Sequence, residues 1–143
     1  MKNLEIYIHI PFCVRKCEYC DFLSFPADDD AKLRYVKGLM SEMIFYGPLM
    51  KNYQVSSVYI GGGTPSSIDE QWIAALMECV FDCFNVLPDA EISIECNPGT
   101  LSREKLLAYK DAGINRLSIG LQSANNDELK RLGRIHTFEQ FVT

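Results

Sequence analysis

Three short stretches of the chain alternate between apolar and polar residues. They cover residues 5–10, 91–96 and 116–121, and in each stretch the isoleucine and leucine side chains fall on every second position. A period of two is that of a β-strand with one apolar and one polar face. The run VSSVYI at residues 55–60 predicts a fourth strand.

Helix signals lie between and after these strands. An acidic run at residues 28–30 suits a helix N-terminus, and Ser67-x-x-Glu70 and Asn125-x-x-Glu128 are capping boxes. We expect helices over residues 28–46, from 67 to about 84, from about 103 to 113, from 125 to 133, and the start of another at Thr137. Repeated strand–helix units predict an α/β fold with a parallel sheet and right-handed crossovers.

The alternation also predicts which face of the sheet is covered. The apolar faces would lie under the helices, and the polar faces would line a common concavity. Tyr7, His9, Glu95 and Gln122 fall on those polar faces, so we expect a polar binding site there, because charged groups would otherwise be buried without partners. The alternative is an ordinary sheet with one solvated face.

Composition narrows the class of protein. The chain has 143 residues, 48% hydrophobic and 23% charged, which is enough for one domain with a core. The net charge of −5 and the absence of a basic stripe argue against a nucleic-acid partner. No apolar run approaches the roughly 20 residues of a membrane span, and we see no secretory leader, so we expect a cytoplasmic protein.

Three cysteines stand within eight residues, directly after the first predicted strand. Cys13, Cys17 and Cys20 are spaced Cys-x3-Cys-x2-Cys. Three thiolates can surround one soft metal centre and would leave one iron of a four-iron cluster without a protein ligand. Three other interpretations are a disulfide framework, a zinc site with His9 as fourth ligand, and a thioredoxin-like Cys17-x-x-Cys20 pair.

A glycine turn, Gly61-Gly62-Gly63-Thr64-Pro65, follows the second predicted strand. Glycine has no Cβ and therefore lets a ligand approach the backbone closely. The turn is not a P-loop, because no Gly-Lys-Ser/Thr follows it. The alternative is a tight strand-to-helix connection.

The cysteine spacing resembles the cluster loop of the radical S-adenosylmethionine (radical SAM) superfamily. The residues at positions 7–13 and 20–22 are similar to those of the branch that contains oxygen-independent coproporphyrinogen III oxidase and the haem chaperone. The resemblance implies a partial (β/α) barrel. About four βα units of an expected six are present, so residues 1–143 would be the N-terminal part of a truncated core domain.

The same resemblance implies the cofactors and their ligands. Cys13, Cys17 and Cys20 would bind a [4Fe-4S] cluster, and the fourth iron would bind SAM, which is cleaved to a radical that abstracts hydrogen from a substrate. The positions that match SAM contacts in the family are Tyr7, Tyr19, Gly62, Gly63, Thr64, Glu95, Gln122 and Arg134. The alternative for Glu95 is a surface carboxylate, and the alternative for Arg134 is an exposed cation at a helix end. The two tyrosines could instead be packing residues.

Two functions remain within this resemblance. The first is a haem chaperone that binds haem and delivers it to acceptor proteins. The second is an oxidase that decarboxylates two propionates of coproporphyrinogen III. The oxidase resemblance calls for a further cysteine two positions after Cys20, where this chain has Phe22, so we favour the chaperone. A radical SAM enzyme with an unrelated substrate is a third hypothesis. We expect Cys79, Cys83 and Cys96 to be core residues.

Overall fold

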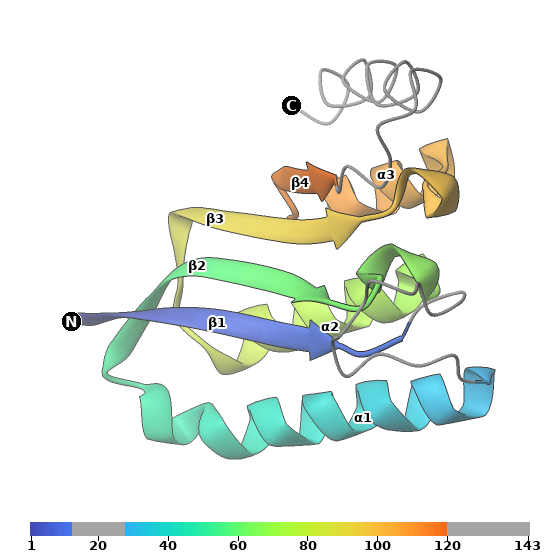
Figure 1. Ribbon diagram of the computed structural model, residues 1–143. Helices are drawn as coiled ribbons and strands as arrows, with labels where there is room; N and C mark the ends of the chain where they lie inside the picture. Colours follow the sequence, from blue (N-terminus) through green and yellow to red (C-terminus); the bar gives the residue numbers. More distant parts are fainter. Residues whose placement is uncertain (13–27, 120–143) are drawn as a thin grey trace.

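A computed structural model describes residues 1–12 and 28–119, which form a four-stranded parallel sheet with helices packed on it (Figure 1). The strands are β1 (Lys2–Ile10), β2 (Tyr53–Gly62), β3 (Val86–Cys96) and β4 (Arg116–Ile119). The helices are α1 (Asp29–Tyr46), α2 (Glu70–Cys83) and α3 (Arg103–Asp111), with single 3-10 turns η1 (Pro48–Met50), η2 (Pro65–Ser67) and η3 (Pro98–Thr100). The expected α/β class is confirmed.

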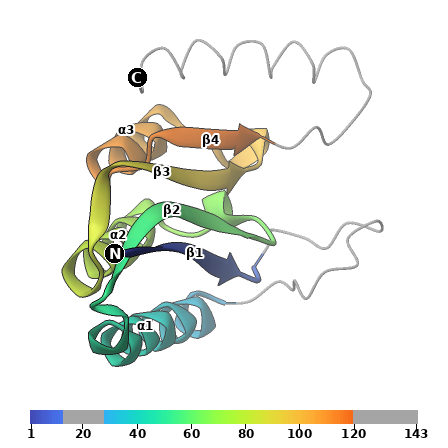
Figure 2. The same cartoon turned by 90° about the vertical axis from the view of Figure 1, so that its left-hand side faces the viewer.

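All three helices lie on one face of the sheet (Figure 2). The strands follow one another in the order β1-β2-β3-β4 and every pair is parallel. Right-handed crossovers between consecutive neighbouring strands place each connecting helix on the same side. This is the winding of a barrel, and it leaves the other face of the sheet without a helix from these units.

The side chains divide between the two faces as the alternation predicts. Ile8 is 3% exposed and Ile10 is fully buried, whereas Tyr7 is 57% exposed. Tyr7 pairs with Tyr59 of β2, and Tyr59 pairs with Ser93 of β3, so one polar row crosses the sheet. The helix-covered face is apolar, and Cys79 and Cys96 belong to its buried core, as expected.

The boundaries of the strands differ from the expected ones. β1 begins at Lys2 instead of Glu5, β2 covers two more residues at each end, and β3 begins at Val86 instead of Glu91. Ladder hydrogen bonds join backbone groups, so they continue past the residues that have the alternating apolar pattern. Both the β1–β2 and β2–β3 ladders also shift register once, near Leu4 and near Val55, which the period-two pattern does not reveal.

The helix starts are mostly as predicted, with one exception. Asp28 caps α1 by accepting a hydrogen bond from the Ala31 N–H at 2.8 Å. The capping box at Ser67 was wrong. Ser67 is part of η2, and α2 is capped instead by Asp69, whose Oδ1 accepts from the Gln71 N–H at 2.8 Å. Pro65 starts the separate 3-10 turn, and this moves the first α-helical residue to Glu70.

The remaining expected elements, around Asn125-x-x-Glu128 and Thr137, lie outside the described residues. No helix in the described ranges is long and apolar enough to cross a bilayer.

Candidate functional site

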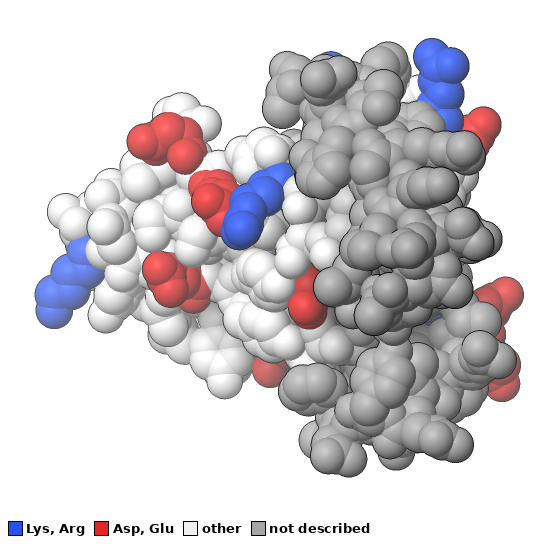
Figure 3. All heavy atoms as spheres, turned by 45° about the horizontal axis from the view of Figure 1, so that its top comes forward, with Lys and Arg blue, Asp and Glu red and all other residues white. Residues whose placement is uncertain are grey.

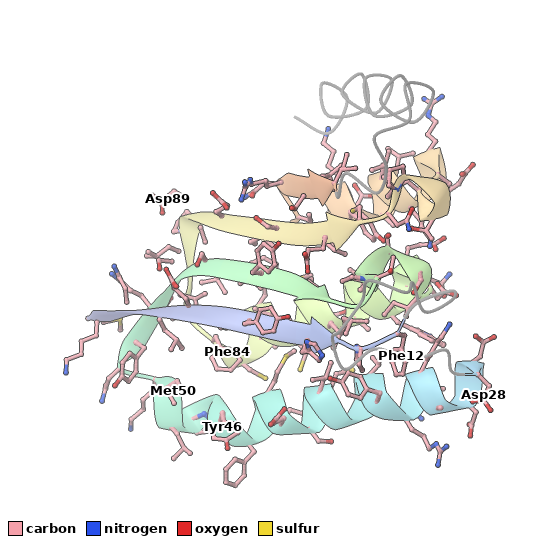
Figure 4. The ribbon with its side chains drawn as sticks, viewed as in Figure 1. Phe12, Asp28, Tyr46, Met50, Phe84 and Asp89 are labelled. Carbon is pink, nitrogen blue, oxygen red and sulfur yellow. The ribbon has the colours of Figure 1, made fainter. Side chains whose placement is uncertain are left out.

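The carboxyl ends of β1, β2 and β3 form one edge of the sheet, and the turns that follow them lie together there. Phe12 lies just beyond the end of β1, at the same end of the molecule as Asp28 at the start of α1 (Figure 4). Tyr46, at the other end of α1, lies at the opposite end (Figure 4). Ligands of parallel α/β folds bind at this carboxyl edge, so we call it the rim.

The glycine turn is hydrogen-bonded to both neighbouring strands. The N–H of Gly62 donates to Glu95 Oε1 at 2.8 Å on the β3 side. On the β1 side, the N–H of Gly63 donates to the carbonyl of Ile10 and the N–H of Thr64 donates to the carbonyl of Phe12, each at 2.7 Å. Three successive amides are therefore used inside the protein. What the turn can offer a ligand is carbonyl oxygen, which suits a cationic amino group and does not suit a phosphate.

Glycine is required at these positions by the close packing of the three strand ends. Gly62 has φ of +118°, and a Cβ there would lie 2.7 Å from the carbonyl oxygen of Ile10. A Cβ on Gly63 would lie 2.6 Å from the carbonyl oxygen of Phe12. The packing of the strand ends therefore accounts for these glycines, as in the interpretation of a tight connection, and the ligand role of the turn stays a prediction.

Glu95 stands at the end of β3 and faces the glycine turn. It is half-buried, and one of its carboxylate oxygens anchors the turn through Gly62. A carboxylate has a second oxygen that can accept hydrogen bonds from a ribose diol. Glu95 therefore combines a structural contact with the position that the sequence predicted for a ligand contact.

Tyr7 and His9 lie side by side on the polar face of β1. The Tyr7 hydroxyl is 3.1 Å from His9 Nδ1, and the Tyr7 ring stacks on that of Tyr59 with centroids 6.1 Å apart. Burial, then the charges of Glu95 and Tyr59, raise the pKa of Tyr7, so its phenol remains a neutral hydrogen-bond donor. Tyr35 of α1 donates to the carbonyl of His9 at 2.6 Å, which holds the end of β1 against α1.

Two further parts of this region were not predicted from the sequence. Tyr59 forms the aromatic pair with Tyr7. The sequence signal that could have indicated Tyr59 is its polar-face position within residues 55–60. Ser66 of η2 is fully buried, and its hydroxyl joins the turn after β2 to the turn after β3. No sequence pattern marks a buried serine, because burial depends on how the two turns meet.

Six predicted site residues lie outside the described ranges: Cys13, Cys17, Cys20, Tyr19, Gln122 and Arg134. Among residues 1–12 and 28–119 no cluster of three or more histidine, cysteine or acidic side chains could hold a metal ion. Of the predicted residues that are described, the structure brings Gly62, Gly63, Thr64 and Glu95 together at the rim. Tyr7 lies on the adjoining polar face.

Charge over the molecule follows no single sign. On the visible part of the described surface, acidic and basic side chains are both present, scattered between uncharged residues (Figure 3). Arg116 pairs with Glu91 at 2.9 Å on the polar face, and both side chains are more than half exposed.

Comparison with known proteins identifies the relatives of this chain. The family model described as the radical SAM superfamily matches residues 7–143. The heme chaperone HemW of Escherichia coli is 42% identical over 93% of this chain, and that of Bacillus subtilis is 39% identical over 96%. The bovine radical S-adenosyl methionine domain-containing protein 1, mitochondrial, is 38% identical over 95%.

A solved structure also matches. The structure of E. coli coproporphyrinogen III oxidase (HemN), described as a radical SAM enzyme, superposes on 99% of this chain with a TM-score of 0.86 and 28% identity. The chain spans about a third of the length of these proteins: 35% and 36% of the two chaperones, 31% of the bovine protein and 35% of the oxidase.

Proposed function

This chain belongs to the radical SAM superfamily, and on that premise we propose that the full-length protein is a haem chaperone, which binds haem and delivers it to acceptor proteins. The observation that carries the proposal is the identity of 39–42% to the two bacterial heme chaperones over nearly the whole chain. Phe22, where the oxidase resemblance calls for a cysteine, supports the same assignment.

Membership of the superfamily implies a [4Fe-4S] cluster and SAM, and the described residues fit SAM. A ligand amino group needs acceptors, and the glycine turn has its amides occupied, so carbonyl oxygens are what it offers on this edge. An adenosine ribose needs an acceptor for its diol, and Glu95 lies beside that turn. When bound, the reduced cluster and SAM together supply reductive cleavage of the sulfonium.

We assign the protein's contribution to its own groups. Cys13, Cys17 and Cys20 would hold the cluster. The carbonyls of Gly62 and Gly63 and the hydroxyl of Thr64 would receive the amino group of SAM, because the Thr64 carbonyl already accepts from the Ser67 N–H at 2.9 Å. Glu95 would accept from the ribose. Tyr7, as a neutral phenol, would line the cofactor's side of the sheet, and Tyr19, Gln122 and Arg134 would complete the site.

We further propose the setting of this region. Residues 1–143 would be the N-terminal part of a radical SAM core, since the chain spans about a third of its relatives. The cytoplasm would be the compartment, because the described Cys79, Cys83 and Cys96 are free thiols that a reducing environment preserves. Haem and its acceptor proteins would be the partners.

The oxidase is the second candidate, and the specific observation in its favour is the structural match to HemN. The described rim would serve both functions, because both belong to the same superfamily. The two candidates therefore differ in what the longer protein does with a porphyrin.

The test uses the full-length protein, reconstituted anaerobically with iron and sulfide. We expect a reduced four-iron signal in electron paramagnetic resonance (EPR) that changes when SAM is added, and loss of that signal in Cys17→Ser. We also expect stoichiometric haem binding and transfer to an apo-haemoprotein. Conversion of coproporphyrinogen III, without haem transfer, would overturn the chaperone in favour of the oxidase. A signal that ignores SAM would contradict the assigned site itself.

A further inference from the structure

Ser66 lies where the turn after β2 meets the turn after β3. It belongs to η2, directly after the glycine turn, and no part of it is exposed. Its neighbours come from the next βα unit: Asn97 and Thr100 in the turn at η3, and Lys105 in α3. A buried hydroxyl must be hydrogen-bonded to avoid a desolvation penalty, and this one is bonded entirely across the two turns.

The donors and acceptors of this contact can be assigned. The Asn97 N–H donates to Ser66 Oγ at 3.0 Å, and the Thr100 hydroxyl donates to the Asn97 carbonyl at 2.8 Å. The short contact of 2.5 Å between the Ser66 and Thr100 hydroxyls must then have Ser66 as the donor, since each hydroxyl has one proton. Ser66, Thr100 and the backbone of Asn97 therefore form a closed ring of hydrogen bonds, in which each donor has one acceptor.

A fourth group ties the backbone of the same residue. The Lys105 ammonium donates to the carbonyl of Ser66. Burial lowers the pKa of Lys105, and the charges of Glu70 and Asp69 oppose that shift. Ser66 is thus held through both its side chain and its main chain by the β3–α3 unit.

The position of this contact relates it to the rim. Two links join the segment after β2 to the end of β3. The first runs from Gly62 to Glu95, and the second runs from Ser66, four residues after Gly62, to Asn97, two residues after Glu95. The two chain segments are therefore bonded to each other both before and after Gly63 and Thr64. If the second link is removed, Gly63 and Thr64 keep their bonds to the β1 side, but their position relative to Glu95 then depends on the single Gly62 bond.

We propose that Ser66 is a positioning residue: its hydrogen-bonded ring with Thr100 and Asn97 holds the glycine turn in register with Glu95, and so sets the affinity for SAM without contact to SAM. The inference rests on the proposed SAM site at the rim. It assigns a role to residues outside the cofactor shell, and Lys105 supports the same turn from α3.

The test compares variants at Thr100 in the reconstituted full-length protein. Thr100→Val keeps the shape of the side chain and removes the hydroxyl, whereas Thr100→Ser keeps the hydroxyl. SAM affinity is measured by titrating the change in the EPR signal of the reduced cluster. We expect Thr100→Val to weaken SAM binding about tenfold, the size of one lost buried hydrogen bond, and Thr100→Ser to restore affinity to within about twofold of wild type.

A second pair of variants covers the case in which Thr100→Val does not fold. Ser66→Ala is expected to weaken SAM binding as Thr100→Val does. Its matched control is Ser67→Ala, because the buried Ser67 hydroxyl has no hydrogen-bond partner in the described part of the chain. Cluster content and the signal without SAM should equal those of wild type in all four variants, and the signal at saturating SAM should also be unchanged.

The outcomes separate this inference from the proposed function. One outcome is that wild type responds to SAM, while Ser66→Ala and Thr100→Val bind SAM as tightly as their control variants. In that case the positioning role is wrong and the proposed SAM site stands. If Ser66→Ala and Ser67→Ala lose affinity equally, the effect is general packing and the role is again wrong. If wild type itself ignores SAM, both the site and the positioning role are overturned.

Discussion

Gly62 is the described residue of the glycine turn with a positive φ, and Gly62→Ala measures how strongly that conformation constrains the rim. Gly62 has φ of +118°, a conformation that L side chains rarely adopt. Its backbone N–H is bonded to Glu95, so the turn cannot relax to another conformation without breaking that bond. A backbone conformation of this kind costs a non-glycine residue about 1–3 kcal/mol.

Steric overlap adds to this conformational cost. The new Cβ would lie 2.7 Å from the carbonyl oxygen of Ile10 and 2.8 Å from His9 Nδ1. The His9 ring can rotate, but the Ile10 carbonyl accepts from the Gly63 N–H and cannot move freely. Overpacking of this kind costs about 1–3 kcal/mol, so we expect Gly62→Ala to destabilise the protein by roughly 2–6 kcal/mol.

The assay is thermal unfolding of the full-length protein, followed by circular dichroism. For a protein about three times as long as this chain, a shift of about 1–2 °C per kcal/mol predicts a fall of roughly 2–12 °C in the apparent Tm. Gly38→Ala is the matched control, since Gly38 is exposed in the middle of α1 and a Cβ there would have no neighbouring atom within 4 Å. Alanine there should stabilise the protein by about 0.5–1 kcal/mol. An unchanged Tm in Gly62→Ala, or equal losses in both variants, would refute this reasoning.

The core and the helix caps allow three further predictions. Tyr109→Phe should leave stability unchanged or raise it by about 1 kcal/mol in urea unfolding, because the Tyr109 hydroxyl is buried and has no hydrogen-bond partner among the described residues. Burial raises the pKa of the Cys96 thiol from 9 to about 12, so this thiol loses its proton at a lower pH in the unfolded chain than in the folded protein. The free energy of unfolding should therefore keep its full value below about pH 9 and decrease towards pH 12, and the decrease should be less steep in Cys96→Ala. Ser102→Ala should cost about 1 kcal/mol, because the Ser102 hydroxyl accepts from the Lys105 N–H at 3.1 Å at the start of α3.

The sequence pattern predicted the faces of the described residues in the three alternating strands, and the reason is local. Side chains alternate between the faces of a strand whatever the strand pairs with, so Ile8 and Ile10 could be assigned to the core and Tyr7 to the open face before any pairing was known. The capping box at Ser67 failed because capping depends on where the first helical residue lies. Pro65 starts a separate turn, and Asp69 is then the residue in position to cap α2.

Contacts between distant residues were beyond the reach of the pattern. Tyr7 stacks on Tyr59 because the β1–β2 ladder shifts register near Leu4, and without that shift a different residue would face Tyr7. The burial of Ser66 likewise depends on how two separate βα units pack. The turn after β2 was recognised from its glycines, but its partners on β1 and β3 could come only from the fold.

The rim is one structural unit because its turns are bonded to each other rather than only to their own strands. The glycine turn donates to β1 through Gly63 and Thr64 and to β3 through Gly62. The acceptor on the β1 side includes the carbonyl of Phe12, the residue immediately before Cys13. Since the amides of the turn are used in this way, a movement of the backbone at Phe12 would also move the surface that we propose receives the amino group of SAM. The hydrogen bonds that occupy the amides of the turn therefore connect it to the residue before Cys13, which is one of the three cysteines proposed to hold the cluster.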